Sequence, residues 1–125
     1  MMPFVSKNYK YYQGVGAGNG HCVALVRSAC EAPHTSLWKR GAPVREALFE
    51  IGTAIATFDA NGKYGNHTDG RSHTAILLAL DTDGLLVLDQ WVGRPAGERK
   101  IRFKNGKGKA CDDGDRYYII EGILT

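Results

Sequence analysis

The chain has 125 residues, 43% of them hydrophobic, and a formal net charge of +3 at pH 7. This size and composition are typical of a soluble globular protein, so we expect residues 1–125 to form a single domain. No run approaches the roughly 18 uninterrupted apolar residues of a membrane span, and residues 1–12 lack the apolar core of a signal peptide. We therefore expect a protein that is made in the cytoplasm without a signal peptide.

The first predicted element is a helix over residues 22–30, which follows a glycine-rich approach. Residues 14–21 read GVGAGNGH, and Asn19 is a candidate N-cap. Apolar residues then recur at i, i+3, i+4, i+7 and i+8, the pattern of one helix face. They are Cys22, Leu25, Val26, Ala29 and Cys30. Pro33 closes the helix.

A second helix is predicted over residues 43–50, because proline suits the first turn of a helix. Its inner face would consist of Val44, Leu48 and Ile51, and Gly52 would end it.

Strands dominate the rest of the chain. Residues 53–58 (TAIATF) are rich in β-branched and aromatic residues, which favours a strand. The apolar runs 73–80 and 85–92 flank the turn DTDG and predict a buried hairpin, and a last strand covers 116–124. Residues 59–72 are rich in Gly, Asn and Asp and predict a long mobile loop. Helices followed by a mostly antiparallel sheet indicate an α+β fold.

Cys22 occupies a position that suits a nucleophile. In the first turn of a helix, unpaired backbone N–H groups and the positive end of the dipole stabilise a thiolate and lower the pKa of the thiol. The alternative is structural, because Cys22 also lies on the apolar stripe and free cysteine is often a small core residue.

A nucleophilic cysteine requires a base, and His73 is the best candidate among the four histidines. It begins an apolar strand directly after the mobile loop, where a side chain is held rigidly yet is reached from solvent. His21 adjoins Cys22, but neighbouring helix residues do not face each other. His34 and His67 fall where surface residues are expected.

The base must be oriented by a polar partner. Asp89 and Gln90 are the polar residues of the strand that pairs with the His73 strand. A two- or four-residue hairpin loop puts His73 on the same side as Gln90, whereas a three-residue loop or a β-bulge puts Asp89 there. We favour Asp89 because its charge would stabilise an imidazolium, and we keep Gln90 as the alternative.

Taken together, these motifs resemble the NlpC-type and CHAP papain-like cell-wall amidases. GHCVALV is similar to their nucleophile motif, which usually reads G-Q-C; SHTAILL is similar to their G-H-x-A-I strand, and VLDQW to the strand of their third residue. The compact arrangement most resembles the type VI secretion amidase effectors, and within these the third family. The similarity spans about residues 12–92.

The resemblance implies a papain-like α+β fold and a cysteine amidase that hydrolyses peptide bonds in peptidoglycan stems or cross-links. Cys22, His73 and Asp89 would be its catalytic residues, and neither a metal nor another cofactor would be required. Members of the third family are associated with the D,D bond between meso-diaminopimelate and D-alanine. The resemblance also implies delivery by the type VI secretion machinery into the periplasm of a target cell, and a cognate immunity protein in the producer.

One residue departs from the family pattern. His21 stands where relatives carry glutamine, so the oxyanion hole would use the backbone N–H of Cys22 together with the His21 imidazole. We expect the substrate groove to be walled by residues 11–19 and 59–72. The residues expected to line it are Tyr12, Gly20, Tyr64 and Trp91.

Two other interpretations stay open. The side chains of Cys22, His73, Asp89 and His21 are all of zinc-ligand type, although no close C-x-x-C pair is present. Alternatively, the basic stretch 94–109 would bind an anionic polymer in a non-catalytic module, or be a solvated hairpin or loop. No aromatic ladder accompanies these charges, so nucleic acid is not an expected partner. Whether Cys30 and Cys111 form a disulfide depends on the redox compartment.

Overall fold

The regular structure consists of an α-helix and a seven-stranded sheet, in a computed structural model that describes residues 1–123. The helix, α1, spans Cys22–Ala29. The strands are β1 (Met2–Pro3), β2 (Lys39–Pro43), β3 (Thr53–Thr57), β4 (Thr74–Leu80), β5 (Gly84–Trp91), β6 (Arg94–Arg102) and β7 (Tyr117–Gly122). Leu124, the last residue of the final predicted strand, lies outside the described residues, as does Thr125.

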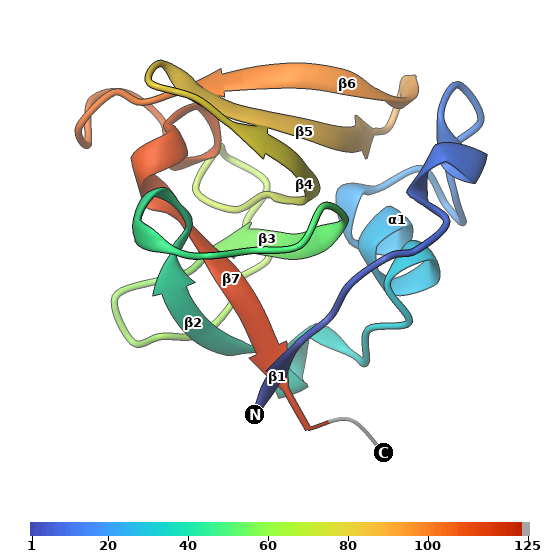
Figure 1. Cartoon of the computed structure of the whole chain (residues 1–125), viewed down its shortest axis with the longest axis horizontal. Helices are drawn as coiled ribbons and strands as arrows, with labels where there is room; N and C mark the ends of the chain where they lie inside the picture. The colour runs from blue at the N-terminus through green and yellow to red at the C-terminus, as the bar shows by residue number, and fades with distance from the viewer. Residues whose placement is uncertain (124–125) are drawn as a thin grey trace.

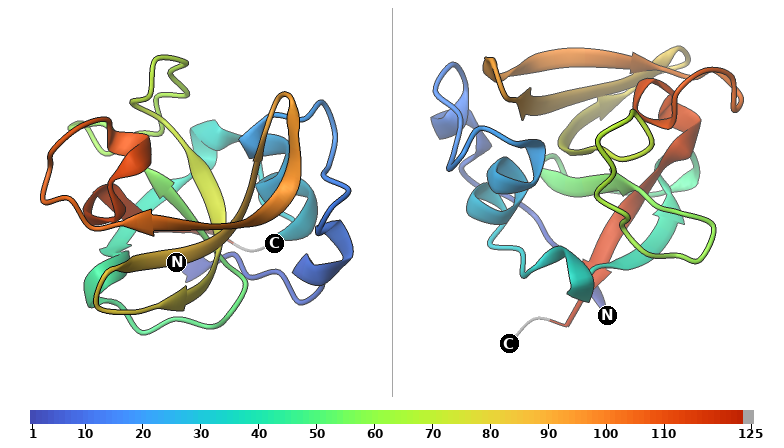
Figure 2. Two further views of the ribbon diagram at one scale, coloured as in Figure 1. Left: turned by 90° about the horizontal axis from the view of Figure 1, so that it is seen from above. Right: turned by 180° about the vertical axis from the view of Figure 1, so that it is seen from behind.

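The strands are antiparallel throughout the described pairs and follow the order β1-β7-β3-β4-β5-β6 across the sheet. β2 also pairs with β7, so β7 contacts three strands that precede it in the chain. In Figure 1, β7 crosses the molecule diagonally, β5 and β6 lie above it, and α1 lies to one side. Residues 59–72 form a long loop that extends away from the strands (Figure 2).

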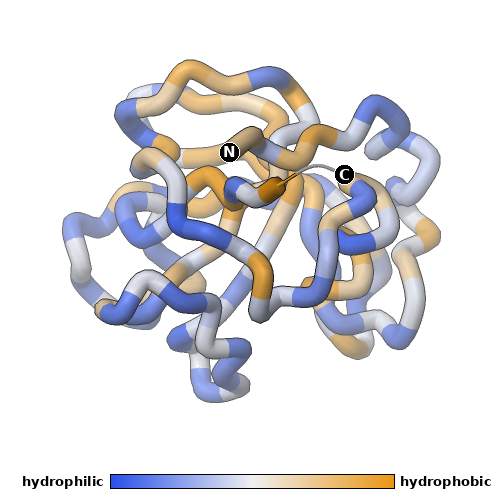
Figure 3. The backbone as a smooth tube through the Cα atoms, turned by 90° about the horizontal axis from the view of Figure 1, so that it is seen from below, coloured by the Kyte–Doolittle hydropathy of each residue, from blue (hydrophilic) through white to orange (hydrophobic). Residues whose placement is uncertain are grey.

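Apolar side chains pack on both faces of the sheet. On one face, Leu25 and Val26 of α1 join a buried cluster that contains Ile76 of β4 and Leu88 of β5. The opposite face carries a second buried cluster of Val44, Ile55, Ala75, Leu77, Leu85, Val87, Ile101, Tyr117 and Ile119. Successive residues of a strand point to opposite faces, so the same strands supply both clusters. In Figure 3 hydrophilic stretches lie all around the periphery of the molecule, including the loop that projects at the bottom of the view.

The predicted first helix and the four predicted strands are confirmed, with ends that move by one or two residues. The hairpin turn is also confirmed: Asp81 accepts hydrogen bonds from the backbone N–H groups of Asp83 at 2.7 Å and Gly84 at 3.0 Å. This side chain therefore closes the turn between β4 and β5, which carry His73 and Asp89 at their far ends.

The second predicted helix is wrong. Residues 39–43 form β2, and only a single 3-10 turn, Val44–Glu46, follows before the backbone at Ala47 becomes extended. Of the expected inner face Val44 is buried, but Leu48 and Ile51 are exposed. A short helix needs tertiary burial of its apolar face, and here the segment instead gains backbone hydrogen bonds by pairing with β7.

Candidate active site

Cys22 is the first residue of α1, as predicted. His21, rather than Asn19, is the N-cap residue, and its extended backbone (φ −75°, ψ 154°) turns the chain into the helix. Asn19 contributes differently, because its side-chain oxygen accepts the backbone N–H of His21 at 3.1 Å. The first N–H groups of a helix have no acceptor four residues back, so those of Cys22 and Val23 are available beside the Cys22 side chain, whereas that of Ala24 donates to the His21 carbonyl at 3.1 Å.

Gln90 fixes the glycine-rich approach to Cys22. Its amide group donates to the carbonyls of Ala17 at 2.9 Å and His21 at 2.8 Å, and its oxygen accepts the N–H of Ala17 at 2.9 Å. Gly16 makes this contact possible: its φ is +89°, and a Cβ there would lie 2.7 Å from the Gln90 oxygen. Gln90 therefore holds the segment that precedes the nucleophile candidate, and its side chain is engaged away from His73.

Asp89 is the residue that meets His73. The Nε2 atom of His73 lies 2.8 Å from Oδ2 of Asp89. The β4–β5 register explains this choice. Near the turn Ala79 pairs with Leu86, but further from the turn Leu77 pairs with Val87, so the register shifts by one residue at Leu78. A bulge of one residue moves every following side chain to the other side of the sheet. The bulge alternative in the sequence prediction is the one that the structure adopts.

Two arginines of β6 surround the Asp89 carboxylate, which is fully buried. Arg99 donates to Oδ2 from Nε at 3.0 Å and from Nη2 at 2.8 Å. Arg94 donates to Oδ1 at 3.1 Å and to the backbone carbonyl of Asp89 at 2.8 Å. Both guanidinium groups also stack near the ring of Trp91, with distances of 4.4 Å for Arg94 and 5.4 Å for Arg99 to its centroid. A buried carboxylate is costly unless it is paired, and here three cationic or polar groups share it.

These contacts set the protonation of the site. Burial acts to raise the pKa of the Cys22 thiol, but the hydrogen bond and charge of His73 outweigh it, and the pKa lies below its ordinary value. Burial acts to lower the pKa of His73, yet hydrogen bonds to Asp89 and Cys22 raise it to about 9. Burial also opposes the ionised form of Asp89, but His73 and Arg99 hold its pKa below the usual range. The arrangement favours a thiolate–imidazolium pair beside an ionised carboxylate.

Tyr64 adds a further polar group to the thiol. Its hydroxyl lies 3.9 Å from the Cys22 sulfur, and its ring packs against Trp38 at 5.0 Å and edge-on to Phe58 at 6.5 Å. Burial and the charge of Cys22 raise the pKa of Tyr64 above its usual range, so the hydroxyl stays protonated and donates toward sulfur.

Cys22 and His73 open into a cleft of about 620 Å³. Loop residues 64–72, including Tyr64, form one wall, and Trp91 and Val92 border it from the end of β5. Tyr64 and Trp91, which were expected in the substrate groove, line this cleft. Tyr12 and Gly20 do not: Tyr12 packs against the core beside α1, and Gly20 borders a neighbouring recess. Of the arm at residues 11–19, Asn19 lines the cleft, whereas residues 15–18 border the neighbouring recess.

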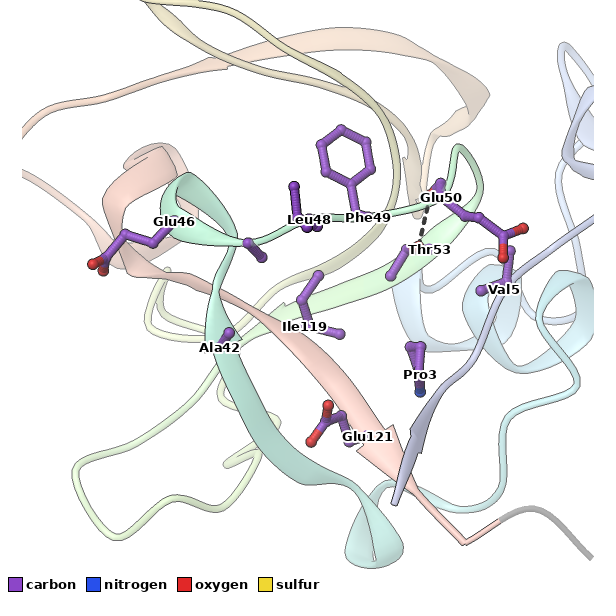
Figure 4. Close-up of a pocket in the computed structure, with 11 residues that line it drawn as sticks. Pro3, Val5, Ala42, Glu46, Leu48, Phe49, Glu50, Thr53, Ile119 and Glu121 are labelled. Carbon is purple, nitrogen blue, oxygen red and sulfur yellow. Dashed lines mark hydrogen bonds between the residues drawn. The ribbon is translucent and has the colours of Figure 1, made fainter.

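A second hollow, of about 680 Å³, lies on another part of the surface, between β1, β2 and β7 (Figure 4). It is lined by Pro3, Val5, Ala42, Glu46, Ala47, Leu48, Phe49, Glu50, Thr53, Ile119 and Glu121. Its described lining contains neither cysteine nor histidine. Cys22 and His73 therefore line the cleft described above and not this hollow.

The structure bears on the alternative interpretations. Asp89 directs its oxygens at His73 and two arginines, an arrangement that competes with a cation, and within residues 1–123 no three His, Cys, Asp or Glu side chains are placed to hold a metal.

The basic stretch at residues 94–109 is not an open loop throughout: its first nine residues are β6, and Arg94 and Arg99 point to Asp89. Sequence reasoning missed these two arginines, because regular alternation would put residues five positions apart on opposite faces of a strand.

The three cysteines are unbridged in the described structure. Cys30 is buried and contacts the carbonyl of Gly52, whereas the backbone of Cys111 bonds to Gly70 beside the loop. Among the described residues, none of the helices has the length and apolar character required to cross a bilayer.

A family model described as domesticated amidase effector 2 matches residues 4–120. The chain belongs to this family. It is 36% identical over 135 residues to the type VI secretion amidase effector 2 protein of Salmonella typhi, covering 96% of this chain and 100% of that protein. It is 40% identical over 112 residues to domesticated amidase effector 2 of Ixodes scapularis, covering 86% of this chain and 75% of the tick protein.

A solved structure of a type 6 secretion amidase effector 2 superposes with a TM-score of 0.80 at 32% sequence identity, covering 97% of this chain and 96% of the other. The match confirms the papain-like α+β fold and the resemblance to type VI secretion amidase effectors. It corrects one detail, because the amidase effector 2 family takes the place of the third family suggested by the motifs. The bond expected from the third family accordingly loses that support.

Proposed function

We propose that this chain is a single-domain cysteine amidase of type VI secretion that hydrolyses peptide bonds of peptidoglycan. The observation that carries the proposal is the position of His73, which lines the same cleft as Cys22 and hydrogen-bonds, at 2.8 Å, to the Asp89 carboxylate. Membership in a family of named amidase effectors supports it. No cofactor is needed for this chemistry.

In the proposed mechanism, the Cys22 thiolate attacks the scissile carbonyl while His73 supplies a proton to the departing amine. Water then attacks the resulting thioester, with His73 accepting its proton, and the acid product and free thiol are released. Asp89 keeps the imidazole in the productive orientation and stabilises its charge. The buried position of Asp89 between two arginines limits the movement of this carboxylate.

The tetrahedral oxyanion would be stabilised by the backbone N–H of Cys22 at the helix start, because preorganised donors act most strongly in a water-poor site. The His21 imidazole is the second proposed donor: it is exposed at the cleft edge, and although His21 is the N-cap residue, its side chain makes no capping hydrogen bond. Gln90 is not proposed for this role, because its amide is engaged by Ala17 and His21.

For the biological setting we propose delivery by the type VI machinery into the periplasm of a target cell, and an immunity protein that occupies the cleft. The name of the Salmonella typhi relative supports the route. The exposed mouth of the cleft, between the loop at residues 64–72 and Trp91, is the surface that such an inhibitor would cover.

Digestion of purified peptidoglycan tests the proposal. The wild-type chain is expected to release defined fragments whose masses identify the bond, in the stem or in the cross-link, and Cys22→Ala is expected to release none. Cys111→Ala is the matched control, because it removes a thiol outside the site and should leave activity intact. Full hydrolysis by Cys22→Ala would refute the mechanism, and inactivity of the folded wild type would refute the substrate.

A further inference from the structure

The cleft carries positive charge without any acidic residue in its described lining. Arg27 of α1 lines it together with Cys22, and His21, His67 and His73 are its other ionisable basic groups. A cleft with one sign of charge concentrates ligands of the opposite sign. The protein as a whole is nearly balanced, with 16 Lys and Arg against 13 Asp and Glu, so this local asymmetry does not follow from composition.

Arg27 is exposed, and its guanidinium makes no ion pair or hydrogen bond with the residues that the structure describes. Other arginines are used internally, since Arg94 and Arg99 bind Asp89 and Arg45 binds Asp115. A guanidinium presents a planar set of donors that matches a carboxylate, so Arg27 is free to receive one from a ligand.

The opposite wall does not neutralise this charge. Two acidic residues lie near that wall without lining the cleft: Asp59 directs Oδ2 at the Nε2 atom of His67 at 2.9 Å, and Asp69 of the loop is paired with Arg71 at 2.9 Å. Asn66 and Thr68, which do line it, supply uncharged polar groups. A ligand carboxylate in the cleft therefore meets Arg27 with no Asp or Glu side chain of the described lining beside it.

We propose that Arg27 binds a free carboxylate of the substrate and makes the cleft selective for acidic peptides. This rests on the proposed function, and it names the feature of the peptidoglycan peptide that is recognised. Arg27 follows Cys22 by five residues, or about 7.5 Å of helix rise. An extended peptide spans about 3.4 Å per residue, so the carboxylate lies about two residues from the scissile carbonyl. Stem peptides carry such groups on D-glutamate and on meso-diaminopimelate.

The test compares three cross-linked muropeptide dimers: the free acid, one amidated at diaminopimelate, and one amidated at D-glutamate. Hydrolysis is measured with wild type, Arg27→Gln and Arg27→Lys, and binding is measured by calorimetry on the Cys22→Ala background. Arg102→Gln is the matched control, because it removes one exposed arginine charge on β6 outside the cleft lining.

Wild type is expected to prefer the free-acid dimer. The amidation that weakens hydrolysis and binding by wild type identifies the recognised carboxylate. Arg27→Gln should lower kcat/KM for the free acid by about tenfold, mainly through KM, and should remove the preference, as expected for one charged hydrogen-bonded pair. Arg27→Lys should retain part of it, and Arg102→Gln all of it.

An unchanged preference in Arg27→Gln, in both hydrolysis and binding, would overturn the assignment. If no dimer is cut by wild type but binding still shows an Arg27-dependent preference for the free acid, the carboxylate site stands and the proposed function fails. If neither hydrolysis nor binding distinguishes acid from amide in wild type, the carboxylate site is refuted.

Discussion

The imidazole of His73 and the carboxylate of Asp89 meet at 2.8 Å because a single irregularity at Leu78 shifts the register of the hairpin that carries them. In a regular hairpin the partner on that side would have been Gln90. Because of the bulge, the two neighbouring polar residues make different contacts. Asp89 faces the proposed base, and Gln90 hydrogen-bonds to the segment that leads to Cys22.

The pH dependence of kcat/KM is expected to be bell-shaped. The active form is the thiolate–imidazolium pair, so activity is lost at low pH when the Cys22 thiol, whose pKa lies below its ordinary 9.0, takes up a proton. Activity is lost at high pH when His73, with a pKa of about 9, gives up its proton. The rate of alkylation by iodoacetamide, followed against pH, should show the same acid limb. An alkylation rate that rises only through the ordinary thiol range would contradict the lowered pKa.

Arg99→Gln is expected to move the alkaline limb of this profile upward. Loss of the guanidinium leaves the negative charge of Asp89 less shared, so the imidazolium of His73 is held more strongly and its pKa rises. We expect kcat/KM at neutral pH to fall several-fold as well, because the Asp89 carboxylate loses hydrogen-bond donors that hold it in place beside His73. NMR titration of the His73 ring measures the shift directly.

Arg99→Lys keeps the charge and should largely restore the wild-type limb, whereas Arg102→Gln should not move it. A merely structural role for Arg99 predicts a lower melting temperature with the limb unchanged, and that result would contradict its influence on His73.

Gly16→Ala should destabilise the fold by about 2–3 kcal/mol, because a positive φ strains alanine and the new Cβ displaces the hydrogen bonds of Gln90. Chemical denaturation measures the loss, and kcat/KM should fall too, since Gln90 also holds His21. Gly14→Ala is the control for strain alone: its φ is +81° with nothing within 4 Å of the Cβ, so about 1–2 kcal/mol is expected. Equal losses in the two variants would show that the Gln90 contact contributes nothing.

Tyr64→Phe removes the hydroxyl that faces the Cys22 sulfur at 3.9 Å while keeping the ring between Trp38 and Phe58. The thiolate loses a donor, so the pKa of Cys22 should rise and the acid limb should move upward, with kcat/KM reduced a few-fold at neutral pH. The melting temperature should change little, because the buried aromatic packing remains. Identical pH profiles for Tyr64→Phe and wild type would exclude this role.

Much of the arrangement was accessible from local patterns. The helix after the glycine-rich approach and the apolar strands carry periodicities that a sequence displays directly, so the positions of Cys22 at a helix start and of His73 directly before a strand were predictable. The choice between Asp89 and Gln90 was not accessible, because a bulge in the middle of β4 leaves no local signature. Arg94 and Arg99 were read as part of a basic stretch, since only the fold reveals that a buried anion faces them.

The prediction of a second helix was wrong for a related reason. Residues 43–50 have the spacing of a helix face, but pairing of β2 with β7 depends on residues about 80 positions further along the chain. Such long-range pairing outweighs helix propensity in a short segment.

The position of β7 has a consequence for the order in which the molecule is made. β1, β2 and β3 all pair with β7, which follows them by more than 59 residues in every case. During synthesis these early strands wait for a partner that emerges after Cys22, His73 and Asp89 have all been translated. Closure of such distant pairs is slow relative to local structure. His73 and Asp89 are therefore held by the complete sheet, and Cys22 by the helix that packs against it, only after β7 has been translated.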